Sequence, residues 1–406
     1  MNVTVKPGKA CGVVAAPPSK SMAHRLLICA GLSQGTSRIS GVALNEDILA
    51  TIDCLRALGA TCEIEKDTVT VCGVDLHPAK PIQTLCCRES GSTLRFFIPL
   101  GLLCGSEVSF TGTQKLLSRP LNVYADMCAE RGYSFRCHSD GVCVKGVLEG
   151  GEFSVPGDIS SQFITGLLFA LPLTSSDSLI RITPPVESRG YIDLTLQALQ
   201  AFGVCARWQD AHTLYISGNQ RYQPADMTVE GDYSGAAFYA ALNALGSDIT
   251  VTGLDPDSLQ GDKIYGQYFQ KLSQGRPTLH IADCPDLGPI LFAVAAAKNG
   301  GVFTGTRRLK IKESDRAAAM AQELSAFGAE VTVKEDEVIV RTTELHGPDR
   351  VLWGHNDHRI VMSLAVLLTL TGGQISGAQA VQKSFPDFFA RLQELGIEVL
   401  IHEAEQ

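Results

Sequence analysis

The sequence lacks the short motifs that carry the commonest nucleotide, hydrolase and metal chemistry. It contains no G-x-x-x-x-G-K-[ST] and no G-x-G-x-x-G, so it has neither a P-loop nor a dinucleotide fingerprint. It also has no G-x-S-x-G elbow and no H-E-x-x-H, and the pair His355 and His358 has no obvious third metal ligand. We therefore expect no metal and no cofactor, and a chemistry that rests on lysine, arginine, histidine and carboxylates.

An excess of positive charge and a long apolar run are also missing. Lysine and arginine total 34 against 43 acidic residues, which gives a formal net charge of −9. Such a chain lacks the broad basic surface that nucleic acid or a membrane surface requires. The longest apolar run, at residues 360–370, is too short to span a bilayer. We expect neither partner, so any anion site must be a local concentration of cations.

The thirteen cysteines form no C-x-x-C pair, and Cys29, Cys54, Cys104 and Cys128 lie inside apolar runs. Cysteines in such positions are typical of small buried side chains in a reducing compartment. Nothing near Met1 resembles a signal or transit peptide. These features predict a cytoplasmic protein.

What the sequence does contain is an internal repeat of roughly seventy residues, present six times. Each copy has a strand that ends near glycine, a polar loop and an amphipathic helix that ends at another glycine; the clearest pair begins at 109–113 and 302–306. Three copies before about residue 229 and three after it predict two similar lobes. We expect residues 14–229 to form one lobe, and residues 1–13 with 230–406 to form the other.

Six further helices are apolar nearly all round, which predicts that they are buried on all sides. They are expected at residues 26–32, 96–103, 163–171, 236–245, 290–297 and 360–370. Each opens with capping residues, and a helix N-terminus attracts anions. Capping alone does not explain why Lys20, Arg25, Arg95 and Arg359 lie in first turns, where a cation opposes the helix dipole. The pattern predicts a cationic cleft between the lobes that binds a multiply anionic phosphorylated substrate.

Nine motifs, in this order along nearly the whole chain, resemble the 5-enolpyruvylshikimate-3-phosphate synthase family of enolpyruvyl transferases. They are Pro18-Ser19-Lys20-Ser21 with Arg25, Ser90-Gly91-Ser92-Thr93 with Arg95, Arg119-Pro120, Ser160-Ser161-Gln162, Ser188-Arg189-Gly190-Tyr191, Pro285-Asp286, Lys312-Glu313-Ser314-Asp315-Arg316, Asn356-Asp357-His358-Arg359 and Lys383-Ser384-Phe385-Pro386. Two positions depart from the pattern of many members: Glu89 replaces a common asparagine, and Arg308 stands where some have asparagine.

The resemblance implies an α/β fold of two lobes, each with three βαβαββ repeats around buried parallel helices, an inside-out α/β barrel. It implies transfer of the enolpyruvyl group of phosphoenolpyruvate to the 5-hydroxyl of shikimate 3-phosphate with release of phosphate, a step of aromatic amino-acid biosynthesis. It also implies a monomer without cofactor, and glyphosate as a possible inhibitor.

The resemblance also implies roles for individual residues. Phosphoenolpyruvate is expected to contact Lys20, Gly91, Arg119, Gln162, Arg316, Arg359 and Lys383. Shikimate 3-phosphate is expected to contact Lys20, Ser21, Arg25, Ser160, Ser161, Gln162, Ser188, Tyr191, Asp286 and Lys312. Two proton-transfer groups are needed, and we assign Asp286 to the 5-hydroxyl and Glu313 to C3 of phosphoenolpyruvate. Lys20 assists at the hydroxyl or the leaving phosphate, and His358 supports Glu313.

Two alternatives stay open. The first is the sister transferase that acts on UDP-N-acetylglucosamine, but that family has a Gly-Gly-Cys loop before its Arg-Pro, and residues 115–120 here contain no cysteine. The second is a non-catalytic repeat scaffold that binds polyanions. A scaffold should show a basic stripe without paired carboxylates, whereas this chain is acidic and places Asp286 and Glu313 beside cations.

Overall fold

The computed structural model describes residues 1–76, 84–342 and 344–402. The chain forms two compact units: the N-terminal unit, Lys20–Glu230, and the C-terminal unit, which combines Met1–Ser19 with Gly231–Gln406. The second crossing falls next to the position expected from the sequence, and the first lies six residues after the expected one. The reason is strand β2 (Cys11–Ala15), whose five residues all pair in parallel with β15 (Asp248–Thr252) and so keep the chain in the C-terminal unit beyond Val13.

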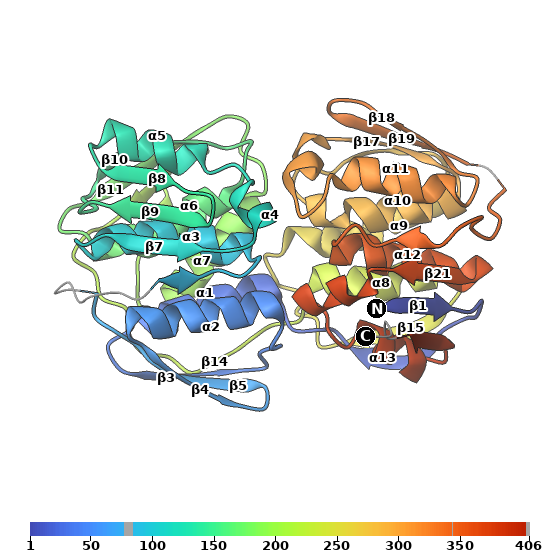
Figure 1. The fold of residues 1–406 in the computed structure, drawn as a ribbon, viewed down its shortest axis with the longest axis horizontal. Helices are drawn as coiled ribbons and strands as arrows, with labels where there is room; N and C mark the ends of the chain where they lie inside the picture. Colours follow the sequence, from blue (N-terminus) through green and yellow to red (C-terminus); the bar gives the residue numbers. More distant parts are fainter. Residues whose placement is uncertain (77–83, 343, 403–406) are drawn as a thin grey trace. The chain divides into compact units, whose positions relative to one another are not determined.

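Helices with almost no exposed side chain form the centre of the N-terminal unit (Figure 1). They are α1 (Lys20–Leu32), α3 (Gly91–Leu103) and α6 (Ser161–Ala170). All residues of α3 except Ser92 are buried, and in α6 only Gln162 is not. The incompletely buried residues of all three helices thus lie in the first turn, where the sequence places the ligand contacts. Amphipathic helices α2 (Glu46–Leu58), α5 (Asn122–Glu130) and α7 (Arg189–Ala201) pack around them.

The sheets of the N-terminal unit share one topology, in which a parallel pair is followed by two antiparallel pairings. The first has the order β14 (Met227–Thr228), β3 (Thr36–Ser40), β5 (Thr68–Cys72), β4 (Thr61–Glu65). The second has the order β6 (Leu85–Cys86), β7 (Val108–Thr111), β9 (Gly141–Lys145), β8 (Ser134–Cys137). The third has the order β10 (Gly151–Pro156), β11 (Ser178–Thr183), β13 (Thr213–Ile216), β12 (Ala206–Trp208).

The C-terminal unit repeats this plan around α8 (Tyr233–Ala244), α10 (Gly288–Ala297) and α12 (His358–Thr371). Its outer helices are α9 (Tyr265–Gln274), α11 (Arg316–Ser325) and α13 (Phe388–Glu394). One sheet has the order β16 (Thr278–His280), β17 (Gly301–Thr304), β19 (Glu337–Arg341), β18 (Glu330–Val333). Another has the order β20 (Leu352–Trp353), β21 (Gly373–Ser376), β1 (Asn2–Val5), β22 (Val399–His402), and the pair β15–β2 is the third.

These elements confirm the expected α/β class and the six copies of the repeat. The matched segments at 109–113 and 302–306 overlap β7 and β17, each the second strand of its sheet. Helix α2 ends as predicted at Gly59, which adopts φ 107° and donates its amide to the carbonyl of Arg56. Each unit has its own apolar core, so the repeats of one unit bury their apolar faces against one another.

The prediction that the cysteines are buried is correct for only seven of the thirteen. Cys11, Cys72, Cys86, Cys137 and Cys205 are exposed. The first four lie on strands, where alternate side chains point away from the core. All thirteen are free thiols.

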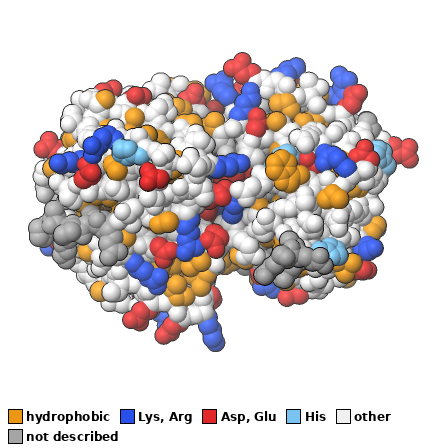
Figure 2. All heavy atoms as spheres, in the orientation of Figure 1, with side chains coloured by type: hydrophobic (Ala, Val, Ile, Leu, Met, Phe, Trp, Pro, Cys, Tyr) orange, Lys and Arg blue, Asp and Glu red, His pale blue; other side chains and the backbone are white. Residues whose placement is uncertain are grey.

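The surface agrees with the acidic net charge of the sequence, and the helices agree with its lack of a long apolar run. On the face shown in Figure 2, acidic and basic side chains of the described residues are interspersed, and no broad stretch is basic. Within the described ranges, no helix combines the length and apolar character needed to cross a membrane.

Candidate functional site

In the N-terminal unit, Arg95 and Gln162 join the first turns of α3 and α6. The Arg95 guanidinium donates to the Gln162 amide oxygen at 2.7 Å and lies 4.9 Å from the centre of the Phe163 ring. The Gln162 amide nitrogen in turn donates to the Ser92 hydroxyl at 2.9 Å. These contacts fix both orientation and position of the Gln162 amide, which the sequence assigns to substrate.

Gly91 and Arg119 lie against each other in the same unit. A Cβ atom added at Gly91 would lie 2.5 Å from Nη1 of Arg119, closer than any real contact of that kind. A side chain at this position would therefore displace the guanidinium from the place that it has here. The structure thus brings together two residues that the sequence assigned to phosphoenolpyruvate.

Arg25 is buried and its guanidinium is used inside the protein. It donates to the Thr195 hydroxyl at 2.9 Å, to the Ser21 carbonyl at 2.6 Å and to the Tyr191 carbonyl at 2.8 Å. Burial lowers its pKa to about 10, which still leaves it charged at neutral pH. Arg25 thereby holds Ser21 of α1 next to Tyr191 of α7, two residues expected to meet shikimate 3-phosphate.

The serines expected to contact shikimate 3-phosphate lie at helix starts. Ser160 caps α6, and its hydroxyl accepts a hydrogen bond from the backbone amide of Gln162 at 3.3 Å. Ser188 precedes α7 with φ 57°, a left-handed conformation that is unusual for a residue with a side chain. Ser160, Ser161 and Ser188 are all buried.

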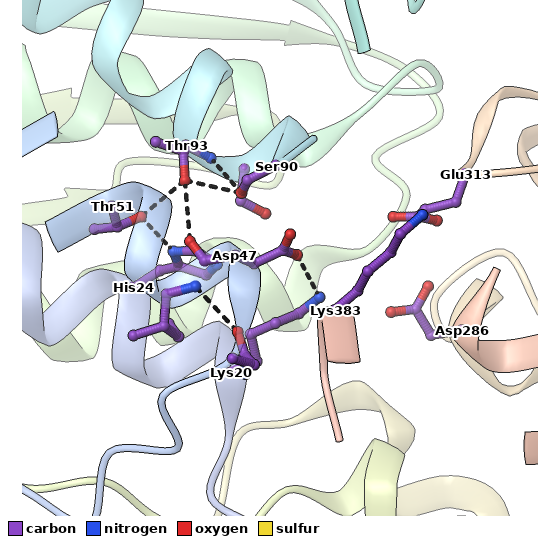
Figure 3. A network of polar contacts seen from close by, with 12 residues as sticks. Lys20, His24, Asp47, Thr51, Ser90, Thr93, Asp286, Glu313 and Lys383 are labelled. Carbon is purple, nitrogen blue, oxygen red and sulfur yellow. Dashed lines mark hydrogen bonds and ion pairs between the residues drawn. The ribbon is translucent and has the colours of Figure 1, made fainter. Parts of the chain in front are cut away.

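A buried hydroxyl network that the sequence did not reveal connects α1, α2 and α3 (Figure 3). Nδ1 of His24 lies 2.8 Å from the Thr51 hydroxyl, which lies 2.8 Å from that of Thr93, and Thr93 donates to the Ser90 hydroxyl at 2.8 Å. Ser90 caps α3 directly before Gly91. Burial, then the charges of Lys20 and Arg25, holds the pKa of His24 well below its usual value. His24 is therefore a neutral, structural histidine.

The same network lies beside Lys20, whose ammonium forms an ion pair with Asp47 at 2.7 Å. Thr93 also lies 3.4 Å from the Asp47 carbonyl. Lys20 is thus anchored to the start of α2, and α2 is tied to the start of α3. Asp47 was missed in the sequence because a carboxylate in a first helical turn is an ordinary capping residue.

We predict that Thr51→Val lowers the free energy of unfolding by about 1–3 kcal/mol. Valine has nearly the shape of threonine but no hydroxyl, so the His24 ring nitrogen and the Thr93 hydroxyl each lose a buried hydrogen-bond partner. Denaturant unfolding of the purified protein measures this. Thr61→Val, at an exposed threonine of β4, is the matched control and should change the value by less than about 0.5 kcal/mol. Equal effects of the two variants would contradict the role of the network.

In the C-terminal unit, the buried Arg316 holds three carboxylates at once. It begins α11, and its side chain is only 1% exposed. Its Nη1 lies 2.8 Å from Asp286, its Nη2 lies 2.8 Å from Glu313, and its Nε lies 2.9 Å from Asp357. Asp357 also caps α12 by accepting from the Arg359 amide at 2.9 Å. One planar guanidinium thus orients both acids that the sequence assigned to proton transfer.

Two further cations converge on Asp286, which remains 23% exposed. Nη2 of Arg359 lies 3.3 Å from one carboxylate oxygen, and Nζ of Lys312 lies 3.4 Å from the other. Burial alone would raise the pKa of Asp286, but Lys312, Arg359 and Arg316 outweigh it and hold that pKa well below its usual range. Asp286 is therefore ionised at neutral pH.

The remaining predicted residues of this unit lie around the cluster. His358 is buried in the first turn of α12, and Lys383 donates from its ammonium to the Asn356 carbonyl at 2.6 Å. Figure 3 draws Lys383 with its ammonium directed to the same part of the unit as the Glu313 carboxylate. Arg308 is buried and donates to the Ala282 carbonyl at 3.3 Å, so this departure from the family pattern lies inside the protein.

Whether this part of the unit can hold a metal ion depends on how its histidine, cysteine and acidic side chains are arranged. His355, considered as a ligand from the sequence, has its Nε2 at 2.9 Å from Glu323. Across the part of the chain that the structure describes, no group of three or more histidine, cysteine, aspartate or glutamate side chains is arranged to hold a metal ion. The site offers cations and carboxylates.

Comparisons with known proteins agree with this geometry. The family model EPSP synthase (3-phosphoshikimate 1-carboxyvinyltransferase) matches residues 5–392. A 3-phosphoshikimate 1-carboxyvinyltransferase of Clostridium kluyveri is 41% identical, over 98% of both chains. That of Clostridium beijerinckii is 40% identical, over 97% of both chains. An EPSP synthase structure from Acinetobacter baumannii superposes with a TM-score of 0.80 at 22% identity and covers 99% of this chain and 100% of its own, which shows the shared fold.

Proposed function

This chain belongs to the EPSP synthase family, and from that premise we propose that it transfers the enolpyruvyl group of phosphoenolpyruvate to the 5-hydroxyl of shikimate 3-phosphate and releases phosphate. The observation that carries the proposal is the cluster around Arg316, where Asp286 and Glu313 are held among cations. Such a cluster provides what the reaction requires, a receptor for anions with two carboxylates in fixed positions.

For phosphoenolpyruvate, we propose contacts with residues of both units. The cations are Lys20, Arg119, Arg316, Arg359 and Lys383. Gly91 and Gln162 complete the set, Gly91 because its missing side chain leaves room for Arg119. Guanidinium groups suit a carboxylate and a phosphate, since each can bind with two parallel hydrogen bonds.

For shikimate 3-phosphate, we propose that the hydroxyls of Ser21, Ser160 and Ser188 bind the phosphate. Arg25 and Lys312 are also proposed to contact this substrate. The full proposed set is Lys20, Ser21, Arg25, Ser160, Ser161, Gln162, Ser188, Tyr191, Asp286 and Lys312. The internal hydrogen bonds of Arg25 support a role in holding Ser21 and Tyr191 in place.

In the addition step, the 5-hydroxyl attacks C2 of phosphoenolpyruvate while C3 gains a proton. We propose that Asp286 orients the hydroxyl and accepts its proton. A carboxylate held by Lys312, Arg359 and Arg316 is a weak base in the free enzyme. Anionic substrates draw on the same cations, which weakens their hold on Asp286 and raises its basicity when it is needed.

In the elimination step, C3 loses a proton and the bond from C2 to the phosphate oxygen breaks. We propose that Glu313 donates and then removes the C3 proton, since Arg316 fixes its carboxylate. His358 supports Glu313, and Lys20 stabilises the negative charge of the departing phosphate. Addition adds one proton to C3 and elimination removes one, so a single carboxylate can donate the proton and take it back.

The pKa of Lys312 predicts how activity depends on pH. Burial lowers this pKa from 10.5 to about 8, with Asp286 opposing and Arg308 and Arg316 assisting. The ammonium of the free enzyme therefore loses its proton as the pH rises through about 8, and kcat/KM for shikimate 3-phosphate should fall there. The unfolded chain keeps this proton up to a pH of about 10.5. The contribution of Lys312 to the free energy of unfolding therefore rises as the pH increases from about 8 to about 10.5.

The pH profile of kcat/KM, measured for the parent and for Lys312→Arg, tests this. The guanidinium stays charged throughout, so the variant should lose the fall near pH 8. An unchanged fall in Lys312→Arg would assign it to another group.

A phosphate-release assay separates the proposed reaction from its alternatives. With phosphoenolpyruvate present, release should require shikimate 3-phosphate and should not occur with UDP-N-acetylglucosamine. Release with the nucleotide sugar alone would identify the sister transferase. Binding of phosphoenolpyruvate without any release would favour the scaffold.

We also propose that the protein is a monomer of the cytoplasm and that glyphosate, a multiply charged anion, competes with phosphoenolpyruvate for the same cations. Size-exclusion chromatography coupled to light scattering measures the first. Raising the phosphoenolpyruvate concentration should relieve inhibition by glyphosate if the second is correct.

A further inference from the structure

The loop directly before α12 adopts an uncommon backbone conformation. His355 has φ 50° and Asn356 has φ 53°, two consecutive left-handed residues that are not glycine. Such conformations persist only where surrounding contacts impose them, and they occur mainly at functional sites. The next residues are Asp357 and Arg359, which belong to the Arg316 cluster.

Glu323 supplies those contacts from α11. It is fully buried, with 0% side-chain exposure, and it lies two helical turns after Arg316 on the same face. Its carboxylate accepts from Nη1 of Arg350 at 2.8 Å, from the Trp353 amide at 3.1 Å and from Nε2 of His355 at 2.9 Å. All three donors belong to the segment 350–357, which contains β20 and the loop before α12, so one buried charge anchors this segment to α11.

The carboxylate stays ionised in this environment. Burial alone would raise the pKa of Glu323, but the hydrogen bonds from His355 and Arg350 and from the Trp353 amide outweigh it and lower the pKa. A buried carboxylate with three donors from one segment is costly to disturb, because loss of its charge leaves those donors without an equal partner.

The fastened loop ends at the groups that bind the cations of the site. The Asn356 carbonyl accepts from Lys383 at 2.6 Å, and the Asp357 carboxylate accepts from Nε of Arg316 at 2.9 Å. A shift of this loop therefore moves the partners of two proposed phosphoenolpyruvate contacts together. Within the described residues, the donors to the Glu323 carboxylate are Arg350, Trp353 and His355, and none of them is proposed to bind shikimate 3-phosphate.

We propose that Glu323 is a positioning residue that holds the segment 350–357, with its left-handed residues His355 and Asn356, in place. It thereby sets the geometry of the phosphoenolpyruvate end of the site. This inference rests on the proposed function for its substrate, but the fastening of the loop is a separate physical statement. It goes beyond that function because Glu323 contacts the loop and acts only through Asn356 and Asp357.

The variant Glu323→Gln removes the charge and keeps the shape. We expect KM for phosphoenolpyruvate to rise about tenfold or more, the usual effect of weakening charged hydrogen bonds, with KM for shikimate 3-phosphate within about twofold. Glu330→Gln, at an exposed glutamate paired with Arg341, is the matched control and should change neither constant. If Glu323→Gln leaves both constants unchanged, or raises them equally, the inference is wrong.

A double-mutant cycle with His355→Gly tests the strain directly. Glycine adopts φ 50° without cost, so the loop with glycine needs less fastening. His355→Gly combined with Glu323→Gln should therefore bind phosphoenolpyruvate no more weakly than Glu323→Gln alone. Additive losses in the double variant would overturn the inference.

Hydrogen exchange of residues 350–357 provides a readout that does not depend on turnover. Exchange of this segment should be faster in Glu323→Gln than in Glu330→Gln, and unchanged exchange would overturn the inference. If the parent protein releases no phosphate, the proposed function fails while this comparison still decides the role of Glu323. Should Glu323→Gln not fold, Arg350→Gln removes one donor at the half-exposed edge of the loop and should produce the same faster exchange.

Discussion

Arg316→Lys is expected to lower kcat/KM for phosphoenolpyruvate by a factor on the order of a thousand or more, since it removes a bidentate anion receptor and disturbs both of the acids proposed to transfer protons. An ammonium is a single point of charge and cannot reach Asp286, Glu313 and Asp357 as the three guanidinium nitrogens do. Two of the three carboxylates would lose a charged partner. Asp286 would keep Arg359 and Lys312, whereas Glu313 would lose its 2.8 Å contact with the guanidinium.

The same substitution should also lower stability. Breaking a buried ion pair costs about 3–5 kcal/mol where one charge is deleted, and lysine keeps the charge, so we expect a loss of about 2–4 kcal/mol. Arg341→Lys, at an exposed pair with Glu330, is the control and should change stability by less than about 1 kcal/mol. Steady-state kinetics and denaturant unfolding measure both effects, and kcat/KM within about tenfold of the parent would contradict the central role of Arg316.

Glu313→Gln should lower kcat by a factor on the order of a hundred or more while substrate binding is kept. The amide oxygen can still accept from Nη2 of Arg316, so the geometry of the cluster is largely preserved. The amide cannot exchange a proton with C3, so both addition and elimination lose their shuttle. The effect therefore falls on kcat.

Calorimetric titration with shikimate 3-phosphate and phosphoenolpyruvate measures substrate binding, and steady-state kinetics measures kcat, so the two experiments together separate binding from turnover. Glu337→Gln is the matched control, since Glu337 lies on β19 and is paired with Lys334, and it should behave as the parent. Near-normal turnover of Glu313→Gln would remove Glu313 from the chemistry. A lost affinity with unchanged kcat would make it a binding residue instead.

The repeats and the buried helices could be predicted from the sequence because both leave local patterns. An apolar run such as 290–297 has no polar face, and a glycine such as Gly59 marks a helix end. The charged first turns of α1 and α3 could also be found, since Lys20 and Arg95 oppose the helix dipole.

The partners of the polar and charged residues could not be predicted, because these side chains meet only in the folded chain. Glu313 and Arg316 are three residues apart, but Asp286 and Asp357 are separated from Arg316 by 30 and 41 residues. Thr51 and Glu323 look like ordinary residues of amphipathic helices. Only tertiary packing shows that one bridges His24 and Thr93 and that the other fastens a left-handed loop.

Turnover in D2O tests the central claim, an addition–elimination reaction between phosphoenolpyruvate and shikimate 3-phosphate, most directly. During the addition, C3 becomes a methyl group that has taken a deuteron from an exchanged acid, and the elimination removes either isotope. We expect one phosphate released per product formed, and deuterium in the vinyl methylene of the product detected by NMR. A product without deuterium at that carbon, or no product from these two substrates, would contradict it.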